Sequence, residues 1–170
     1  MLVWGVIEPC VAPAVSWAQH GPHAGQPAGV AVGQPAVAFH LKTLEGDAIS
    51  LDTFRGRPLV INFFASWCDP CREEMPVIKE LAAKGARGGY SVVGIAVEDG
   101  RAAVTQYASE ARLSFPIALD SSSAVKRAYR IFGPPATFFI DAQGTIRDAV
   151  IGPITAERAR LAMQRAGALR

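Results

Sequence analysis

The chain has 170 residues, of which 50% are hydrophobic and 19% charged, and its formal net charge is +2. This length and composition predict a single globular domain with a substantial core, plus a tail. The small net charge argues neither for nor against nucleic-acid binding, but no Lys/Arg cluster indicates a phosphate-binding surface, so we expect no nucleic-acid partner.

The first 18 residues have several features of an export signal. They form a hydrophobic run ending in Ser16-Trp17-Ala18, which has the small residues of a signal-peptidase site before Gln19. The run lacks a basic start, and one acid and two prolines interrupt it, so it is too broken for a transmembrane helix. A misassigned start codon would explain the missing basic end. We favour a truncated signal peptide over 1–18; a disordered extension is the alternative.

Residues 19–35 are rich in Gly, Pro, Ala and Gln, which predicts a flexible linker. The folded domain is therefore expected over 36–170. Its first element is a short hairpin, because apolar segments at 37–41 and 49–51 flank a turn at Glu45-Gly46-Asp47.

Strands and helices alternate through the rest of the chain. The apolar run at 59–65 predicts a buried strand, and helical spacing of apolar residues predicts a helix over 72–84, kinked at Pro76 and ended by the glycines at 85–89. The later predicted elements are strands at 90–97, 115–119, 136–140 and 146–151, and helices near 104–111, after 121–123 and after Thr155. This alternation predicts a three-layer α/β domain.

The segment Trp67-Cys68-Asp69-Pro70-Cys71 lies between the buried strand and the first helix. A helix start offers unpaired N–H groups and a positive dipole end, which favour a thiolate at Cys68. Cys68 is therefore the predicted nucleophile in dithiol–disulfide exchange, and Cys71 the buried resolving thiol. Pro70 suits the first helical turn, and Trp67 is expected to cover the site.

Asp69 is the predicted tuning residue. A carboxylate beside Cys68 opposes the thiolate and should raise the pKa of the thiol, which favours a reductant over a strong oxidant. A solvated Asp69 with little effect is the alternative. A structural zinc site would need a second ligand pair, and haem attachment would need His where Arg72 stands. We therefore expect no metal and no cofactor.

Two sequence phrases resemble the thioredoxin superfamily, and specifically its TlpA/ResA-like extracytoplasmic branch. They are Val60-Ile61-Asn62-Phe63-Phe64-Ala65-Ser66-Trp67-Cys68-Asp69-Pro70-Cys71-Arg72-Glu73-Glu74-Met75-Pro76 and Gly133-Pro134-Pro135-Ala136-Thr137-Phe138-Phe139-Ile140-Asp141. The resemblance covers residues 36 to the C-terminus. It implies a three-layer thioredoxin fold with an N-terminal β-hairpin addition near 37–51 and a central helix–strand insertion over about 101–119.

The resemblance also implies site residues beyond the cysteines. Pro135 would be a cis-proline that shapes the substrate groove. The preceding Pro134 has no N–H to pair with a substrate strand, so peptide pairing should be looser than in relatives. Asn62 stands where general thioredoxins carry a titrating acid. Asp69, Glu98 and Asp99 are then candidates for moving the proton of Cys71, although the last two could equally be surface acids that cap the next helix.

Together, these features predict an exported, monomeric thiol–disulfide reductase in the periplasm or another extracytoplasmic compartment, with or without a membrane tether. A membrane dithiol donor would supply its electrons, and its substrates would be protein disulfides, with apocytochrome c and copper-site proteins as candidates. Ala136, where cytochrome c maturation members often have Glu, weakens the cytochrome assignment. Disulfide oxidase and isomerase remain alternatives. A thiol peroxidase is disfavoured by the resolving Cys71, and a copper or haem chaperone by the missing Cys-x-x-x-Cys and downstream His.

Overall fold

The computed structural model describes residues 31–169. The predicted signal peptide over 1–18 and linker residues 19–30 lie outside the described residues. Within 31–169, none of the helices has the length and apolarity needed to span a membrane.

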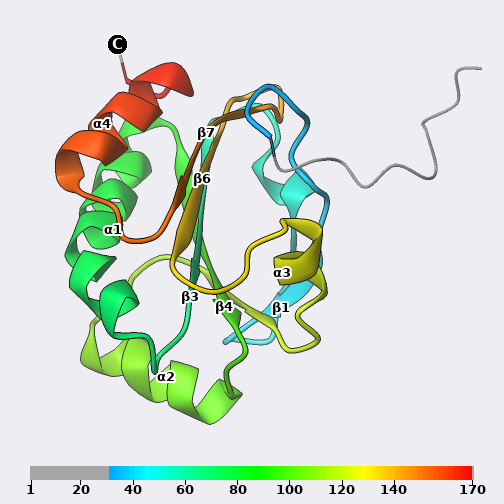
Figure 1. Cartoon of the computed structure of the whole chain (residues 1–170), viewed down its shortest axis with the longest axis vertical. Coiled ribbons are helices and arrows are strands. Elements are labelled where there is room, and N and C mark those ends of the chain that lie inside the picture. The colour runs from blue at the N-terminus through cyan, green and yellow to red at the C-terminus, as the bar shows by residue number, and fades with distance from the viewer. Residues whose placement is uncertain (1–30, 170) are drawn as a thin grey trace, which may run out of the picture.

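The described chain forms a mixed sheet flanked by helices (Figure 1). The strands are β1 (His40–Thr43), β2 (Ala48–Ser50), β3 (Leu59–Phe64), β4 (Ser91–Val97), β5 (Ile117–Asp120), β6 (Ala136–Ile140) and β7 (Ile146–Ile151). The helices are the 3-10 turn η2 (Leu51–Phe54), α1 (Asp69–Gly88), α2 (Arg101–Glu110), α3 (Ala124–Ala128) and α4 (Ala156–Arg165).

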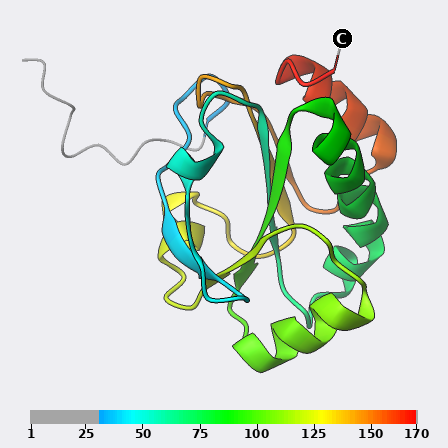
Figure 2. The same cartoon turned by 180° about the vertical axis from the view of Figure 1, so that it is seen from behind.

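The seven strands follow the order β2-β1-β5-β4-β3-β6-β7. β3 pairs in parallel with β4 and antiparallel with β6. Helices α1, α2 and α4 lie on one side of the sheet, and α3 and η2 on the other (Figures 1 and 2). This is the expected three-layer, thioredoxin-like fold.

All six residues of β3 are buried because helices cover both faces of the sheet at its centre. Val60 and Phe64 belong to the core on the α1 side, whereas Leu59, Ile61 and Phe63 belong to the core on the α3 side. The apolar run that marks this strand in the sequence is therefore required by its central position. β3 delivers the chain directly to Cys68.

Helix α1 is longer than predicted at both ends. It starts at Asp69, directly after Cys68, and runs through Pro76 to Gly88. The prediction that Gly85 begins the end of the helix is wrong: a Cβ at Gly85 would lie 2.7 Å from the carbonyl oxygen of Tyr90, so this glycine allows Tyr90 to pack against the helix. Gly89, with a φ of 78°, forms the left-handed C-cap.

The predicted hairpin exists, but its first strand lies further along the chain, at His40–Thr43. β1 pairs with β2 on one side and with β5 on the other, so the hairpin extends the central sheet. The end of the predicted linker also joins the domain: the Gly33 N–H donates to the Ile146 carbonyl (2.7 Å), and the Ile146 N–H donates to the Gln34 carbonyl (2.9 Å).

Candidate active site

The two cysteines lie at the start of α1. Cys68 is its N-cap residue, and its sulfur accepts the backbone N–H of Cys71 at 3.2 Å. The two sulfurs form a disulfide of 2.07 Å. Only 4% of Cys68 is exposed and none of Cys71. Cys68 therefore occupies the position where a helix start stabilises negative charge on sulfur, and Cys71 lies behind it.

Trp67, next to Cys68, is 58% exposed but is fixed by a hydrogen bond. Its indole N–H donates to the backbone carbonyl of Glu98 at 3.0 Å. Glu98 has a φ of 51°, and its carboxylate pairs with Lys126 at 2.7 Å. The Trp67 ring is thus tied to the loop that follows β4.

The three acids singled out from the sequence have different surroundings. Asp99 accepts the backbone N–H of Ser66 at 2.6 Å and that of Gly100 at 2.8 Å, so it supports the loop before Cys68 and the start of α2. Glu98 is engaged with Lys126. Asp69 is exposed at the first position of α1. Glu98 and Asp99 thus lie close to the cysteine loop, and both carboxylates are already bonded there.

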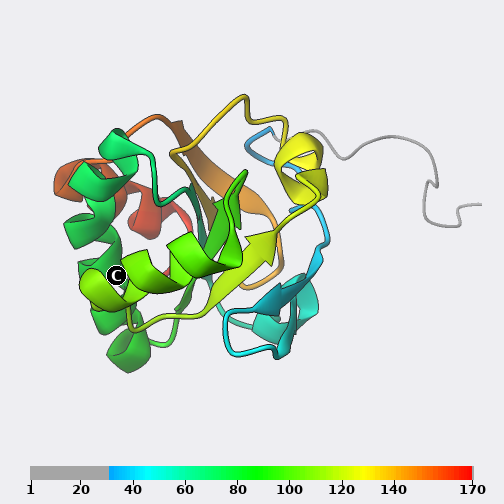
Figure 3. The ribbon, with the colours of Figure 1, turned by 90° about the horizontal axis from the view of Figure 1, so that it is seen from below.

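The Gly-Pro-Pro segment reaches the same end of the sheet. The bond between Pro134 and Pro135 is cis, as the resemblance implies. Pro135 directly precedes β6, whose first residue, Ala136, pairs with Phe63 near the end of β3. The carbonyl of Pro135 accepts the N–H of Gly152 at 2.9 Å. The cis-proline loop and the cysteine loop therefore lie at the same end of the central strands, the end seen in Figure 3.

A buried polar cluster, absent from the sequence-based site, lies behind the cysteines. Glu74 is 3% exposed; one of its oxygens accepts the Asn62 side-chain amide at 2.8 Å, and the other accepts the N–H of Ile154 at 2.7 Å. The Asn62 amide also donates to the Thr137 hydroxyl at 3.0 Å. Burial raises the pKa of Glu74 to about 7, because the two hydrogen bonds only partly offset the loss of solvation.

The sequence does contain a signal for Glu74. It follows Cys71 by three residues on α1, so both side chains lie on one face of the helix, the face that also carries the buried Met75 and Ile78. A charged residue at such an inward position is rarely fully buried unless it has partners or chemistry to perform. Asn62 and Glu74 are therefore one unit, in which the amide of one holds the titrating group of the other.

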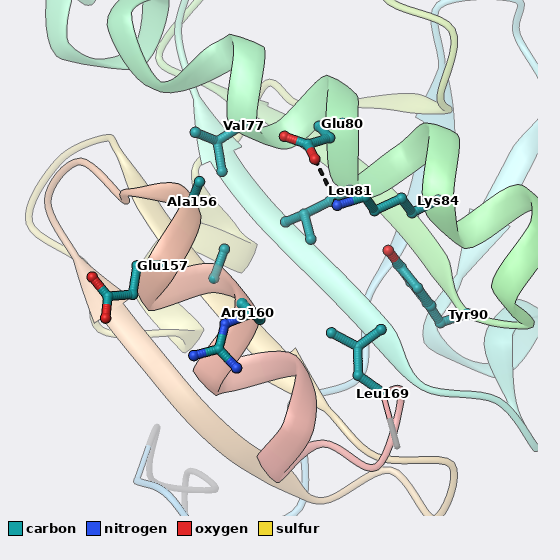
Figure 4. Close-up of a pocket in the computed structure, with 10 residues that line it drawn as sticks. Val77, Glu80, Leu81, Lys84, Tyr90, Ala156, Glu157, Arg160 and Leu169 are labelled. Atoms are coloured by element: carbon teal, nitrogen blue, oxygen red, sulfur yellow. Dashed lines mark ion pairs between the residues drawn. The ribbon is translucent and has the colours of Figure 1, made fainter.

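A separate cavity of about 280 Å³ opens between α1 and α4 (Figure 4). Its wall is largely apolar, with the Glu80–Lys84 ion pair (2.6 Å) on its α1 side. Neither cysteine lines it; its walls are formed by Val77, Glu80, Leu81, Lys84, Tyr90, Ala156, Glu157, Ala159, Arg160 and Leu169. Residues 31–169 contain no cluster of three or more His, Cys, Asp or Glu arranged to hold a metal ion.

Comparison with known proteins agrees with this geometry. Residues 32–149 match the family model described as AhpC/TSA. The chain belongs to the AhpC/TSA family.

Among curated relatives of this AhpC/TSA-family protein is the thiol–disulfide oxidoreductase ResA of Oceanobacillus iheyensis, 34% identical over 131 residues, which are 75% of this chain and 68% of that protein. The thioredoxin-like protein YneN of Bacillus subtilis is 32% identical over 142 residues, 82% of each chain. A putative thiol:disulfide interchange protein DsbE of Chlorobium tepidum has a similar structure, with a TM-score of 0.74 and 27% identity over 82% of this chain and 99% of that one. This AhpC/TSA-family protein is a thiol–disulfide oxidoreductase.

Proposed function

We propose that this protein is an exported reductase of protein disulfides. The observation that carries the proposal is the position of Cys68 as the N-cap of α1, with its sulfur accepting the Cys71 N–H while bonded to the Cys71 sulfur. That arrangement suits a nucleophile whose thiolate is stabilised by the helix start and whose partner thiol closes the cycle.

The cycle starts from the reduced dithiol. The Cys68 thiolate attacks one sulfur of the substrate disulfide, and the other substrate sulfur leaves as a thiolate, which gives a mixed disulfide. The Cys71 thiolate then attacks the Cys68 sulfur and releases the second substrate thiolate. The substrate gains an electron pair and two protons, and the enzyme becomes the Cys68–Cys71 disulfide.

Cys71 must lose its proton before the second attack, and Glu74 is the residue we assign as its acceptor. Glu74 lies one turn beyond Cys71, is buried with it, and has a pKa near 7, so it can both accept and return a proton at neutral pH. The two substrate thiolates take up their protons from solvent, and the proton that Cys71 gave to Glu74 is released to solvent when Glu74 ionises again. Burial favours Glu74 over the other two acids: Glu74 is buried on the helix that carries Cys71, whereas Glu98 is exposed and Asp99 half-buried.

The reductive direction rests on Asp69. Its carboxylate lies in the first turn of α1, beside the sulfur whose thiolate it opposes, so the reduced form is stabilised less than in a strong oxidant. Two kinds of similar protein support an extracytoplasmic location: the ResA relatives and a secreted disulfide oxidoreductase of Mycobacterium tuberculosis. The structure of the latter is 28% identical to this chain, with a TM-score of 0.65 over 77% of this chain and 96% of that one. A membrane dithiol would then reduce the Cys68–Cys71 disulfide back to the dithiol. Apocytochrome c and proteins with copper-site cysteines are candidate substrates.

The test is the reduction potential of the Cys68–Cys71 couple, measured at equilibrium against a dithiol buffer. We expect a value near that of thioredoxin, about −270 mV. Asp69→Asn should make the potential less negative, whereas Glu73→Asn, an exposed neighbour on the same helix, should change it less. A wild-type potential near −120 mV, the range of strong oxidants, would overturn the reductive assignment in favour of disulfide formation.

A further inference from the structure

Three large apolar side chains are exposed at the end of the sheet that holds the disulfide. Phe132 is fully exposed, Ile151 is 65% exposed and Trp67 is 58% exposed. Trp67 directly precedes Cys68, and Phe132 lies three residues before the cis-proline. Ile151 pairs with Ala136, the residue after that proline. We call these three residues the apolar rim; strand pairing places the segments that carry them at the same end of the sheet.

The backbone beside the apolar rim offers little to a substrate. Pro134 and Pro135 have no N–H groups, and the Pro135 carbonyl is already bonded to Gly152 at 2.9 Å. An extended peptide laid along this loop could therefore receive a hydrogen bond from neither proline. Strand addition, which draws its affinity from main-chain hydrogen bonds, is correspondingly weak here. Side chains must supply the affinity and the register.

The recessed disulfide determines what can approach it. Because Cys68 is only 4% exposed and Cys71 not at all, a substrate sulfur must be carried in on a segment that touches the surrounding surface. That surface includes the exposed Trp67, directly before Cys68, and the exposed Phe132, three residues before the cis-proline. An exposed aromatic pair at this place favours an apolar partner side chain, since each surface removes the other from water.

The two aromatic residues are suited to different tasks. Trp67 is held in place by its hydrogen bond to Glu98, itself paired with Lys126, so little side-chain freedom is lost when a ligand covers the ring. Phe132 stands on a loop next to Gly133, where nothing lies within 4 Å of the position of a Cβ. Trp67 thus provides a fixed platform, and Phe132 a side chain that can close over what lies on it.

We propose that Phe132 is a specificity-determining residue, and that with Trp67 and Ile151 it selects cysteine-containing extended segments that carry a large aliphatic or aromatic residue next to the cysteine. Such segments are core sequences of proteins that have not yet folded, so the preferred substrates are unfolded exported chains. This inference rests on the proposed reductase function and adds the substrate class to it.

The experiment compares two peptide disulfides, each made of two identical decapeptides with a single cysteine and flanking lysines. In one peptide Phe precedes the cysteine, and in the other Ser does. The second-order rate constant for oxidation of the fully reduced protein is measured with each peptide, and the readout is the ratio of the two constants. We expect the wild-type protein to favour the Phe peptide about tenfold, the lower end of what an apolar contact contributes to discrimination.

Phe132→Ser should lower that ratio to about 2 or less, and Phe132→Leu should retain most of it. Val32→Ser removes an apolar side chain of comparable exposure from the start of the domain and should leave the ratio unchanged. Equal rates with both peptides, or a Phe132→Ser ratio equal to wild type, would overturn the substrate class while leaving the reductase function intact. Failure of both peptides to oxidise the wild-type protein would overturn the proposed function as well.

Discussion

Two buried carboxylates in this domain have opposite environments. Glu74 on α1 is 3% exposed and Asp148 on β7 is 4% exposed. Asp148 accepts hydrogen bonds from Arg158 (2.5 and 2.7 Å) and Arg165 (2.7 Å), whereas Glu74 has only the neutral donors Asn62 and Ile154.

The different partners shift the pKa values of Glu74 and Asp148 in opposite directions. Burial alone would raise the pKa of both groups. At Asp148 the bonds from Arg158 and Arg165 outweigh burial and hold the pKa below its ordinary value, whereas at Glu74 burial dominates and the pKa rises to about 7. The carboxylate that fastens α4 to the sheet is kept charged by cations, whereas the carboxylate one turn after Cys71 has a pKa near neutral pH, as our proposal for it requires.

The largest effect we expect is on the pH dependence of stability. Because the pKa of Glu74 in the folded protein lies above its ordinary 4.5, the stability that Glu74 contributes is complete below about pH 4.5 and is lost as the pH rises through 7. The loss amounts to about 3 kcal/mol. Urea unfolding of the oxidised protein from pH 4.5 to 8.5 measures it. Glu74→Gln should remove this slope; the exposed neighbour change Glu73→Gln should keep it, and a wild-type slope in Glu74→Gln would refute the assignment.

The second effect is on turnover. Without a proton acceptor beside Cys71, Glu74→Gln should slow resolution of the mixed disulfide about 100-fold at pH 7, which corresponds to about 2.7 kcal/mol of activation free energy. Rapid-mixing measurements with a mixed disulfide on Cys68 isolate this step. Wild type should show a rate that rises with pH through about 7, and the variant should lack that inflection. An unchanged profile in the variant would point to another acceptor.

The smallest effect concerns the other carboxylate. Asp148→Asn should cost about 1–2 kcal/mol of stability at pH 7, the scale of charge-assisted hydrogen bonds to partly exposed arginines. The pKa of Asp148 is lowered in the folded protein, so this contribution is present above about pH 4 and is lost as the pH falls through the folded-state pKa. Denaturant curves at pH 7 and at acid pH check it. Disulfide exchange rates should not change, and a loss of activity in the folded variant would contradict the contrast with Glu74.

The sequence carried the nucleophile and the layout of the fold, because each depends on local pattern. A largely apolar β3, a Cys-x-x-Cys directly before the next helix and a proline pair before β6 are all visible in consecutive residues. Glu74 was missed because its role depends on distant partners: Asn62 lies on β3, and Ile154 is 80 residues further along the chain. Conversely, Glu98 and Asp99 were suggested as proton acceptors only because they follow a strand that ends near the cysteines. Their partners, Lys126 for Glu98 and the Ser66 N–H for Asp99, lie in other parts of the chain and could not be predicted from that position. The length of α1 was underestimated because Gly85 was interpreted as the start of the helix end. Gly85 instead lies within the helix, where the absence of a side chain makes room for Tyr90.

The hairpin added to the sheet has a consequence for how such a protein survives among its substrates. β1 covers the side of β5 that would otherwise be open, and the sheet then ends in β2, which has three residues. An open strand edge invites pairing with any extended chain, and very short edge strands are one way to prevent it. An enzyme that handles unfolded chains is exposed to such pairing continually. At the β2 edge, therefore, this domain presents little open backbone for another chain to pair with, whereas the opposite edge, β7, has six residues.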